Sequence, residues 1–499
     1  MLLRDGLNLR VVTLLVLSAA AVTLSFPRTA LYALVFVALA PTLFVCHGAR
    51  AGAVFAFRAG WAMGFLAHMG TLWWIARLYP TEITYPWLRL PILILLAAFE
   101  GLFYGLAFLG WNAASRHGRW WLWPGVWVVT EYARSLTTLA FPWTVLANTL
   151  TAQPLLLQPA AVGGVWLLDL GLAAVNMLVF KAVERPRYAA VAAGLLACWI
   201  GGSILSMDTE AGSVDVAIVQ PNALPEFKWH QGGKSRVLSD LEALSFAAAE
   251  SLRDARAPLL IWPETALPMV VRPGGSAEFW LARLVDELGM PLITGALGTS
   301  YHRGQDLLTN AAVAVIPGRG IVGRYDKLHL VPFSEKMPFS DTFPAMKNIN
   351  FGQGDYAPGI ESVMLEAGGI RVGVLICFEA ILPALVRQHS DSGAELFANI
   401  TNDSWFGQSG APEQHASISI LRAVEHRRWL VRAANTGLSI IVDPWGRVIR
   451  RGGMFRPEVI TGSVRPRSDR TVYARTGDWA AWLGILAVAW VAVEAWIRR

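Results

Sequence analysis

The chain consists of long apolar stretches toward both ends and a more polar block between them. The apolar runs cover about residues 10–26, 29–47, 55–77, 90–112, 120–136, 157–181, 188–206 and 477–497. Each has roughly the 17–25 residues that a helix needs to cross the hydrocarbon core of a bilayer. We therefore expect a membrane domain of about eight transmembrane helices. The first run lacks a small-residue cleavage site and is followed at once by another run, which favours an uncleaved helix over a signal peptide.

The polar block, from about Ser213 to Arg467, alternates strand-like and helix-like runs. Its predicted strands cover 214–219, 259–262, 292–295, 312–316, 370–376, 396–400 and 439–442, and its predicted helices cover 234–254, 277–288 and 413–434. The strands are apolar on both faces, as in a sheet that is covered on both sides. This pattern predicts an α/β domain. We expect three parts: a seven-helix transmembrane domain over 1–206, a catalytic domain over 207–470 and a C-terminal transmembrane helix over 471–499.

The composition agrees with a membrane protein and gives it an orientation. Only 16 % of the residues are charged, whereas soluble domains carry about 25 %. The expected cytoplasmic flanks hold eleven basic residues: Arg4, Arg10, Arg50, Arg58, Arg116, Arg119, Lys181, Arg185, Arg187, Arg498 and Arg499. The short outer loops hold four: Arg28, Arg77, Arg89 and Arg134. By the positive-inside rule, both termini are cytoplasmic and the polar block faces outward. The formal net charge of +6 is explained by these flanks, so we expect no nucleic-acid partner.

Three ionisable residues lie within or at the edge of the apolar runs, where charge is costly and often functional. Glu100 lies in the middle of its run, and Glu131 and Arg134 are three residues apart, which lets them pair on one helical face. They either hold helices together or line a path for a substrate. The sequence leaves both interpretations open.

A carboxylate, an ammonium and a thiol in the polar block each lie at the end of a strand-like run. Glu264 closes Leu-Leu-Ile-Trp-Pro-Glu, Lys327 follows Gly-Arg-Tyr-Asp, and Cys377 closes Val-Gly-Val-Leu-Ile-Cys. Such a set supplies a base, an oxyanion stabiliser and a nucleophile. Singly, each residue is more typical of a turn, a solvated surface or a core. Together, and in this order, they favour covalent catalysis by Cys377.

Other chemistries have little support in the sequence. The nine histidines are scattered, without a metal-ligand spacing, so we expect no metal site. His329 and His415 lie nearest the motifs, and we expect structural roles for both. No Gly-x-Gly-x-x-Gly or Walker pattern opens a helix after a strand, so no cofactor is expected. The nucleophile elbow of serine hydrolases, Gly-x-Ser-x-Gly, is also absent from the sequence.

Several longer motifs carry a resemblance to a known family. They are Val219-Gln220-Pro221-Asn222, Lys228-Trp229, Trp262-Pro263-Glu264-Thr265, Tyr325-Asp326-Lys327-Leu328-His329-Leu330-Val331-Pro332-Phe333-Ser334-Glu335, Cys377-Phe378-Glu379, Asn402-Asp403-Ser404-Trp405-Phe406-Gly407 and Arg432-Ala433-Ala434-Asn435-Thr436-Gly437. The polar block resembles the nitrilase (carbon–nitrogen hydrolase) superfamily. Over essentially its full length, the chain resembles the bacterial apolipoprotein N-acyltransferase family. The resemblance implies an αββα sandwich with a triad of Glu264, Lys327 and Cys377.

The same resemblance implies supporting or substrate-binding roles for five more residues. These are Trp229, Glu335, Phe378, Glu379 and Trp405. Relatives often have a tyrosine where this chain has Phe378, so a side-chain hydroxyl is not expected to act there. The backbone N–H of that residue remains able to donate to an oxyanion.

The implied reaction transfers an acyl chain in two steps at the bacterial inner membrane, with the catalytic domain in the periplasm. Cys377 takes the sn-1 acyl chain of a phospholipid, with phosphatidylethanolamine as the expected donor. The resulting thioester passes that chain to the α-amino group of the N-terminal diacylglyceryl-cysteine of an apolipoprotein, which is the last step of lipoprotein maturation. Glu264 acts as base and acid, and Lys327 holds the oxyanion. Glu335 positions Lys327 or the incoming amine.

Three alternatives are a membrane-tethered amidase or nitrilase for small amides, a transporter or scaffold with an inactive nitrilase-like domain, and a lipid-linked sugar transferase. The last lacks an Asp-x-Asp pair in the polar block, and the intact triad argues against an inactive domain. A lipid substrate is favoured by a long loop, 318–359, which contains Met337, Phe339, Phe343, Met346 and Phe351. These side chains, like Trp405 and Phe406, either meet lipid or pack on their own domain.

Overall fold

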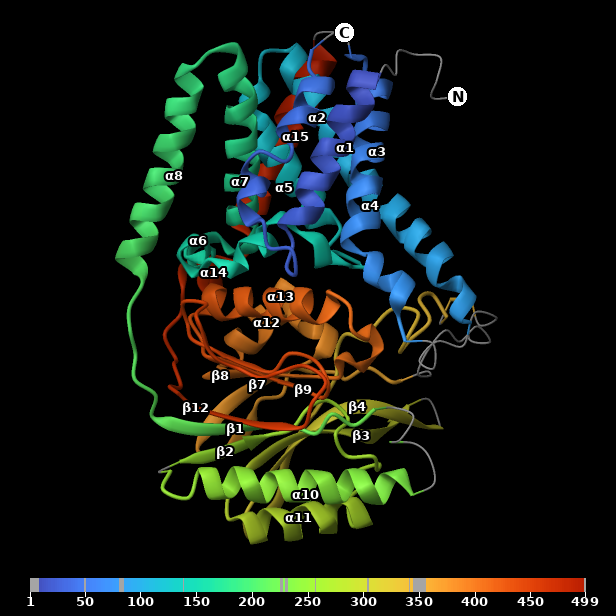
Figure 1. Ribbon diagram of the computed structural model, residues 1–499, viewed down its shortest axis with the longest axis vertical. Coiled ribbons are helices and arrows are strands. Elements are labelled where there is room, and N and C mark those ends of the chain that lie inside the picture. The colour runs from blue at the N-terminus through green and yellow to red at the C-terminus, as the bar shows by residue number, and fades with distance from the viewer. Residues whose placement is uncertain are drawn as a thin grey trace. The chain divides into compact units, whose positions relative to one another are not determined.

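A computed structural model describes residues 9–48, 51–79, 85–137, 139–224, 228, 232–255, 257–302, 305–340, 342–343 and 356–497. The chain forms two compact units (Figure 1). The helical unit comprises Met1–Arg77, Trp87–Met207 and Arg475–Arg499, and the α/β unit comprises Leu78–Pro86 and Asp208–Ala474. The α/β unit therefore includes a short segment from between two predicted membrane helices. The domain boundaries of the sequence analysis, as limits of membrane and periplasmic parts, stay a prediction.

The helical unit is built from apolar helices at the expected places. They are α1 (Leu9–Ser25), α2 (Ala40–Val45), α3 (Ala53–Thr71), α4 (Arg89–Arg116), α5 (Trp123–Ala133), α6 (Pro154–Leu157), α7 (Ala160–Glu184), α8 (Arg187–Ser206) and α15 (Trp479–Ile497). Among the described residues, three helices are long and apolar enough to span a bilayer: Pro86–Arg116, Ala160–Glu184 and Arg187–Ser206. The number of eight spans stays a prediction.

The predicted continuous helix over 29–47 is wrong. A 3₁₀ turn, η2 (Tyr32–Phe36), and the short α2 replace it. Pro41 at the start of α2 lacks the N–H that a continuous helix would use, so the chain breaks before it. The buried Asn176 of α7 satisfies the broken backbone: its Nδ2 donates to Val35 O at 2.8 Å, and its Oδ1 accepts from Leu39 N at 2.8 Å. An apolar unit can contain such a break only because a side chain replaces the missing bonds.

Three charged residues inside the helical unit, Glu100, Glu131 and Arg134, form one buried group. Arg134 donates to Glu131 Oε2 at 2.5 Å, as the three-residue spacing predicted, and to Glu100 Oε2 at 2.7 Å. It also donates to Thr144 Oγ1 at 2.7 Å, in the 3₁₀ segment η8 (Pro142–Thr144). One guanidinium thus connects α4, α5 and the 3₁₀ segment η8. This geometry favours the interpretation that these charges hold the helices together.

The α/β unit contains two six-stranded sheets, and helices cover their outer faces (Figure 1). One sheet has the order β12-β1-β2-β3-β4-β5, with β12 (Glu458–Val464), β1 (Val214–Gln220), β2 (Pro258–Ile261), β3 (Leu292–His302), β4 (Gln305–Ile316) and β5 (Gly320–Asp326). The other has the order β11-β10-β9-β8-β7-β6, with β11 (Val448–Arg451), β10 (Ile440–Val442), β9 (Leu430–Ala434), β8 (Leu396–Thr401), β7 (Ile370–Ile376) and β6 (Leu365–Ala367). Helices α10 (Gly233–Ser251) and α11 (Ser276–Leu288) cover the first sheet, and α12 (Pro383–Asp391) and α13 (Ala411–His426) cover the second. The predicted αββα sandwich is confirmed.

Alternate residues of the strands face the two layers of this sandwich. In β1, Val216 and Ile218 belong to the core between the sheets, whereas Ala217 and Val219 pack with helices α10 and α11. All four side chains are fully buried. Because successive strand residues point to opposite faces, strands that are apolar at every position can fill both layers at once. This explains why the apolar runs in the sequence are unbroken.

The predicted helix over 413–434 is wrong in its second half. Helix α13 ends at His426, and Arg427 adopts a left-handed conformation with φ +50° that ends the helix. The following residues form β9, which lies in the second sheet between β8 and β10. Residues 430–434 are buried on both faces there, so a central strand position outweighs their helical propensity.

Strand β3 passes so close to the loop after β2 that we expect only glycine to fit at position 295. A Cβ at this position would lie 2.5 Å from Thr265 N and 2.6 Å from Glu264 Cα. We expect Gly295→Ala to destabilise the protein by about 1–3 kcal/mol, as overpacking of a dense interior does. The midpoint of thermal unfolding in detergent should fall. Gly323→Ala is the control, because its Cβ would meet only a Leu365 methyl at 3.2 Å. An equal loss in both variants would contradict the prediction.

Candidate active site

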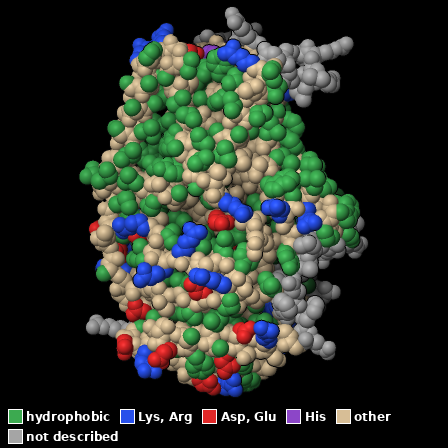
Figure 2. Space-filling model, in the orientation of Figure 1, with side chains coloured by type: hydrophobic (Ala, Val, Ile, Leu, Met, Phe, Trp, Pro, Cys, Tyr) green, Lys and Arg blue, Asp and Glu red, His purple; other side chains and the backbone are tan. Residues whose placement is uncertain are grey.

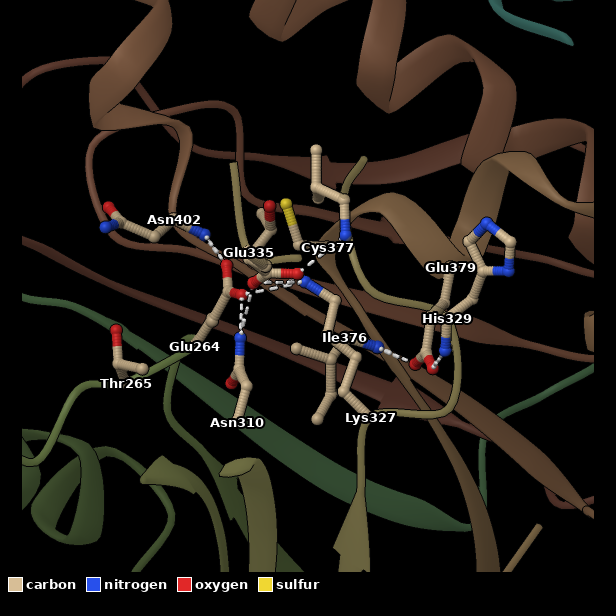
Figure 3. Close-up of polar contacts among 12 residues, drawn as sticks. Glu264, Thr265, Asn310, Lys327, His329, Glu335, Ile376, Cys377, Glu379 and Asn402 are labelled. Carbon is tan, nitrogen blue, oxygen red and sulfur yellow. Dashed lines mark hydrogen bonds and ion pairs between the residues drawn. The ribbon is translucent and has the colours of Figure 1, made fainter. Parts of the chain in front are cut away.

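The three predicted catalytic residues follow three strands of the sandwich and come together. Glu264 lies just after β2, Lys327 directly follows β5, and Cys377 directly follows β7. The first two strands belong to one sheet and the third to the other. Figure 3 shows the side chains of Glu264, Lys327, Glu335 and Cys377 converging on one place. A base, a cation and a thiol are therefore within reach of a single substrate atom.

Both oxygens of Glu264 have fixed partners. Its Oε1 accepts from Asn310 Nδ2 at 2.7 Å and lies 3.4 Å from Lys327 Nζ, and its Oε2 accepts from Asn402 N at 2.8 Å. Only 6 % of Glu264 is exposed. A carboxylate held from both sides keeps one orientation, which is what a general base needs.

Lys327 is buried between two carboxylates. Its Nζ donates to Glu335 Oε1 at 2.8 Å, in addition to the longer contact with Glu264. Glu335 in turn accepts from Asn310 Nδ2 at 3.0 Å and from Val331 N at 2.9 Å. Burial lowers the pKa of Lys327, but the charges of Glu335 and Glu264 outweigh it and hold the pKa above its usual range. Lys327 therefore stays a cation and can stabilise a developing oxyanion.

Cys377 has a backbone conformation that is unusual for a residue with a side chain. Its φ is +52°, in the left-handed region, at the start of the turn η11 (Cys377–Ile381). Burial raises the pKa of its thiol well above the usual range; the charge of Glu264 raises it further, and Lys327 lowers it. The resting thiol is therefore protonated. Attack by sulfur requires a base to take the proton, and Glu264 is the carboxylate beside it.

Glu379 does not face the same side as Cys377, because the 3₁₀ turn interrupts the strand at that point. Its Oε1 accepts from Leu328 N at 2.7 Å, His329 N at 3.2 Å and Tyr325 Oη at 2.8 Å, and its Oε2 accepts from Ile376 N at 2.8 Å. Burial raises its pKa to about 7. The carboxyl group ties the backbone after β5 to the end of β7. Its contacts are those of a positioning residue for Lys327 and Cys377.

The other residues expected at the site have different surroundings. Phe378 is 5 % exposed and stacks on His329, with ring centroids 6.0 Å apart. Trp405 is partly exposed in the short turn η12 (Asp403–Phe406), and its carbonyl accepts from Tyr79 N at 2.8 Å. Trp229 lies outside the described residues. The catalytic and substrate-binding roles of all eight predicted residues stay predictions.

Sequence reasoning assigned no role to Asn310 or Tyr356. Asn310 lies on β4 and donates to both Glu264 and Glu335. Tyr356 donates its N–H to Glu335 O at 2.9 Å, and burial together with the charge of Glu335 raises its pKa to about 12. An amide in an apolar central strand needs hydrogen-bond partners once buried, and that signal in the sequence could have identified Asn310.

Comparison with known proteins gives consistent results. The carbon-nitrogen hydrolase family profile matches residues 215–472, and the profile of the apolipoprotein N-acyltransferase N-terminal domain matches residues 18–178. An apolipoprotein N-acyltransferase from Geobacter metallireducens is 32 % identical over 510 residues, covering 99 % of this chain and 97 % of the relative. One from Rhodopseudomonas palustris is 31 % identical, covering 86 % and 84 %.

Solved structures that match part of this chain include Saccharomyces cerevisiae Nit3, of the nitrilase superfamily, and an amidase from Nesterenkonia. Nit3 is 17 % identical with a TM-score of 0.40, covering 52 % of this chain and 94 % of its own. The amidase is 19 % identical with a TM-score of 0.39, covering 54 % and 95 %.

The charges around Cys377 predict opposite effects of two substitutions on its reactivity. Glu264→Gln removes a charge that raises the thiol pKa, and Lys327→Met removes one that lowers it. At pH 8, alkylation of Cys377 by iodoacetamide should be faster in the first variant and slower in the second. A shift of about one pKa unit changes the thiolate fraction about tenfold. Peptide mass spectrometry reads the rate, with Cys198 as internal reference. Shifts in the same direction would refute this electrostatic assignment.

Proposed function

The chain belongs to the apolipoprotein N-acyltransferase family, and from this membership we propose that it transfers a phospholipid acyl chain to apolipoproteins. The acceptor is the α-amino group of the N-terminal diacylglyceryl-cysteine. The observation that carries the proposal is the convergence of Glu264, Lys327 and Cys377 in an α/β unit whose chain continues into apolar helices. The relatives named above carry the activity in their names, over nearly the whole chain.

In the first half-reaction, the Cys377 sulfur attacks the sn-1 ester carbonyl of the donor, with phosphatidylethanolamine as the expected phospholipid. Glu264 takes the thiol proton as the carbon–sulfur bond forms, and the carbonyl oxygen of the ester becomes an oxyanion beside the Lys327 ammonium. Collapse of this intermediate breaks the ester bond, and Glu264 returns the proton to the departing lysophospholipid. An acyl-thioester on Cys377 remains. The raised thiol pKa supports this order, because it requires a base at the moment of attack.

In the second half-reaction, the free amine of the diacylglyceryl-cysteine attacks the thioester carbonyl. Glu264 removes a proton from the amine, Lys327 again stabilises the oxyanion, and the amide forms as sulfur leaves. The proton on Glu264 returns to Cys377 and regenerates the thiol. Glu335 positions Lys327 throughout, which its 2.8 Å contact supports. The two substrates thus use one site in turn.

The predicted loop 318–359 is wrong over 320–326, which form strand β5. Access for lipid is supported by the part of this segment that follows Glu335. Met337 is buried, but Phe339 and Phe343 are 52 % and 59 % exposed. The predicted Met346 and Phe351 lie outside the described residues. Exposed aromatic side chains that follow Glu335 closely in the sequence favour a lipid substrate over a small amide. This distinguishes the proposal from a membrane-tethered amidase.

The proposed location is the bacterial inner membrane, with both termini cytoplasmic and residues 207–470 in the periplasm. The support is the excess of basic residues, eleven against four, on the flanks assigned to the cytoplasm. On the face that Figure 2 shows, hydrophobic side chains gather over the helical unit and charged side chains gather over the α/β unit.

The test is intact-protein mass spectrometry after incubation with phosphatidylethanolamine. We expect a mass gain of one fatty acyl chain that hydroxylamine removes, because hydroxylamine cleaves thioesters. Cys377→Ala should show no gain, and Glu264→Gln should form the adduct at least about 10²-fold more slowly, as loss of a general base does. The absence of an adduct on folded wild-type protein would favour the amidase. Transfer from the adduct to a diacylglyceryl-cysteine peptide then tests the second half-reaction.

A further inference from the structure

A hydrogen-bonded chain of three buried side chains ends on the backbone of the nucleophile. We propose that His415 is a positioning residue that holds the Cys377 carbonyl, and that Asp403 and Arg432 hold His415. We call these three residues the carbonyl seat. The inference rests on the proposed role of Cys377 as nucleophile. The general structural role that the sequence suggested for His415 thereby becomes a specific one, which is to hold the Cys377 carbonyl.

The contact with the nucleophile is direct. His415 lies on α13, and its Nε2 is 3.1 Å from the carbonyl oxygen of Cys377. The side chain is 1 % exposed, so water does not compete for the carbonyl. Asn399 Nδ2 lies at 3.5 Å from the same oxygen, but its shorter bond, at 2.9 Å, goes to Leu375 O. His415 is therefore the main partner of the Cys377 carbonyl.

The surroundings of His415 decide which ring nitrogen carries the proton. Burial and the charge of Arg432 lower its pKa, so the imidazole is neutral and has a single N–H. Its Nδ1 lies 3.1 Å from Arg432 Nη2 and 3.2 Å from Asp403 Oδ1. A backbone carbonyl only accepts, so the ring nitrogen that faces it, Nε2, carries the proton, and Nδ1 accepts from Arg432 Nη2. That N–H then donates to the Cys377 carbonyl.

Arg432 and Asp403 form a fully buried ion pair behind the histidine. Arg432 Nη2 donates to Asp403 Oδ2 at 2.9 Å, and Thr401 Oγ1 donates to Asp403 Oδ1 at 3.0 Å. The guanidinium holds the pKa of Asp403 at about 2. A Cβ at Gly437 would overlap the Asp403 carboxylate, so only glycine leaves room for it. Two motifs from the sequence, 402–407 and 432–437, thus contribute residues to the carbonyl seat.

The carbonyl seat holds the backbone at a residue whose conformation is unfavourable. A left-handed conformation is costly for a residue with a side chain, and Cys377 adopts one with φ +52°. Because the peptide bond is planar and trans, holding the Cys377 carbonyl also fixes the opposite direction of the Phe378 N–H. The seat therefore sets the direction of the nucleophilic side chain and of a backbone donor expected at the oxyanion.

The experiment compares two amides at position 415. In His415→Gln, the amide nitrogen reaches about as far as Nε2 and can still donate to Cys377 O. In His415→Asn, the amide reaches only as far as Nδ1, so contacts with Arg432 and Asp403 can persist while the contact with Cys377 is lost. His426→Gln is the control, because His426 is equally buried on the same helix and packs on Phe397 and Tyr473.

The first readout is the single-turnover rate of thioester formation on Cys377, at several concentrations of phosphatidylethanolamine vesicles. We expect His415→Asn to be slower by about 10²-fold, as a misplaced reacting group is, at an unchanged half-saturating lipid concentration. His415→Gln should form the thioester at least about tenfold faster than His415→Asn, because its amide restores the near-attack geometry. Equal rates for Asn and Gln, or a loss only in half-saturation, would overturn the proposal.

The second readout does not depend on the acyl-transfer reaction. Hydrogen–deuterium exchange of the peptide containing residues 377–381 should speed up in His415→Asn and stay near wild type in His415→Gln and His426→Gln. If no protein forms a thioester but this exchange pattern appears, the proposed function fails and the seat stands. An unchanged exchange rate in His415→Asn overturns the seat even where acyl transfer is normal.

Discussion

The rest of the site depends on one interaction, the pairing of the buried Lys327 ammonium with the carboxylates of Glu264 and Glu335. A buried charge is costly unless it is paired and hydrogen-bonded. Here the cation is 1 % exposed and has one acceptor at 2.8 Å and another at 3.4 Å. Asn310 bridges the two carboxylates and limits their repulsion. The strand ends that carry these groups must therefore lie together for the domain to fold.

The two carboxylates and the single ammonium leave one negative charge in excess near Cys377. Burial first, and the charge of Glu264 after it, keep the thiol of this proposed nucleophile protonated at rest. The same protonation protects it, because the thiolate and not the thiol is the species that oxidises and alkylates readily. Glu379, bonded to four donors around the ends of β5 and β7, keeps the cation and the thiol in place from the other side.

The unbroken apolar runs allowed an α/β domain and the apolar helices to be predicted, and the strand ends predicted a catalytic set of Glu264, Lys327 and Cys377. The sandwich was implied by the resemblance to a known family. The sequence did not allow the break before Pro41 or the strand after His426 to be predicted, since both depend on contacts with distant residues. Asn176 satisfies the first, and the second depends on β8 and β10 as neighbours. The side of Glu379 was equally unpredictable, because a single turn after Cys377 rotates it away. Asn310 contacts residues 46 and 25 positions away, and His415 contacts Cys377 38 positions away, so local spacing reveals neither.

The inclusion of Leu78–Pro86 in the α/β unit has a consequence for how this protein can be divided. The chain passes between the two units four times, after residues 77, 86, 207 and 474, rather than twice. Tyr79, from the short passage, bonds to the carbonyl of Trp405, far away in sequence. The α/β unit is thus not a detachable module bounded by two linkers. A fragment that contains only residues 208–474 would lack Leu78–Pro86, which belongs to the α/β unit. The α/β unit therefore cannot be cut out of the chain as one continuous piece without losing this segment.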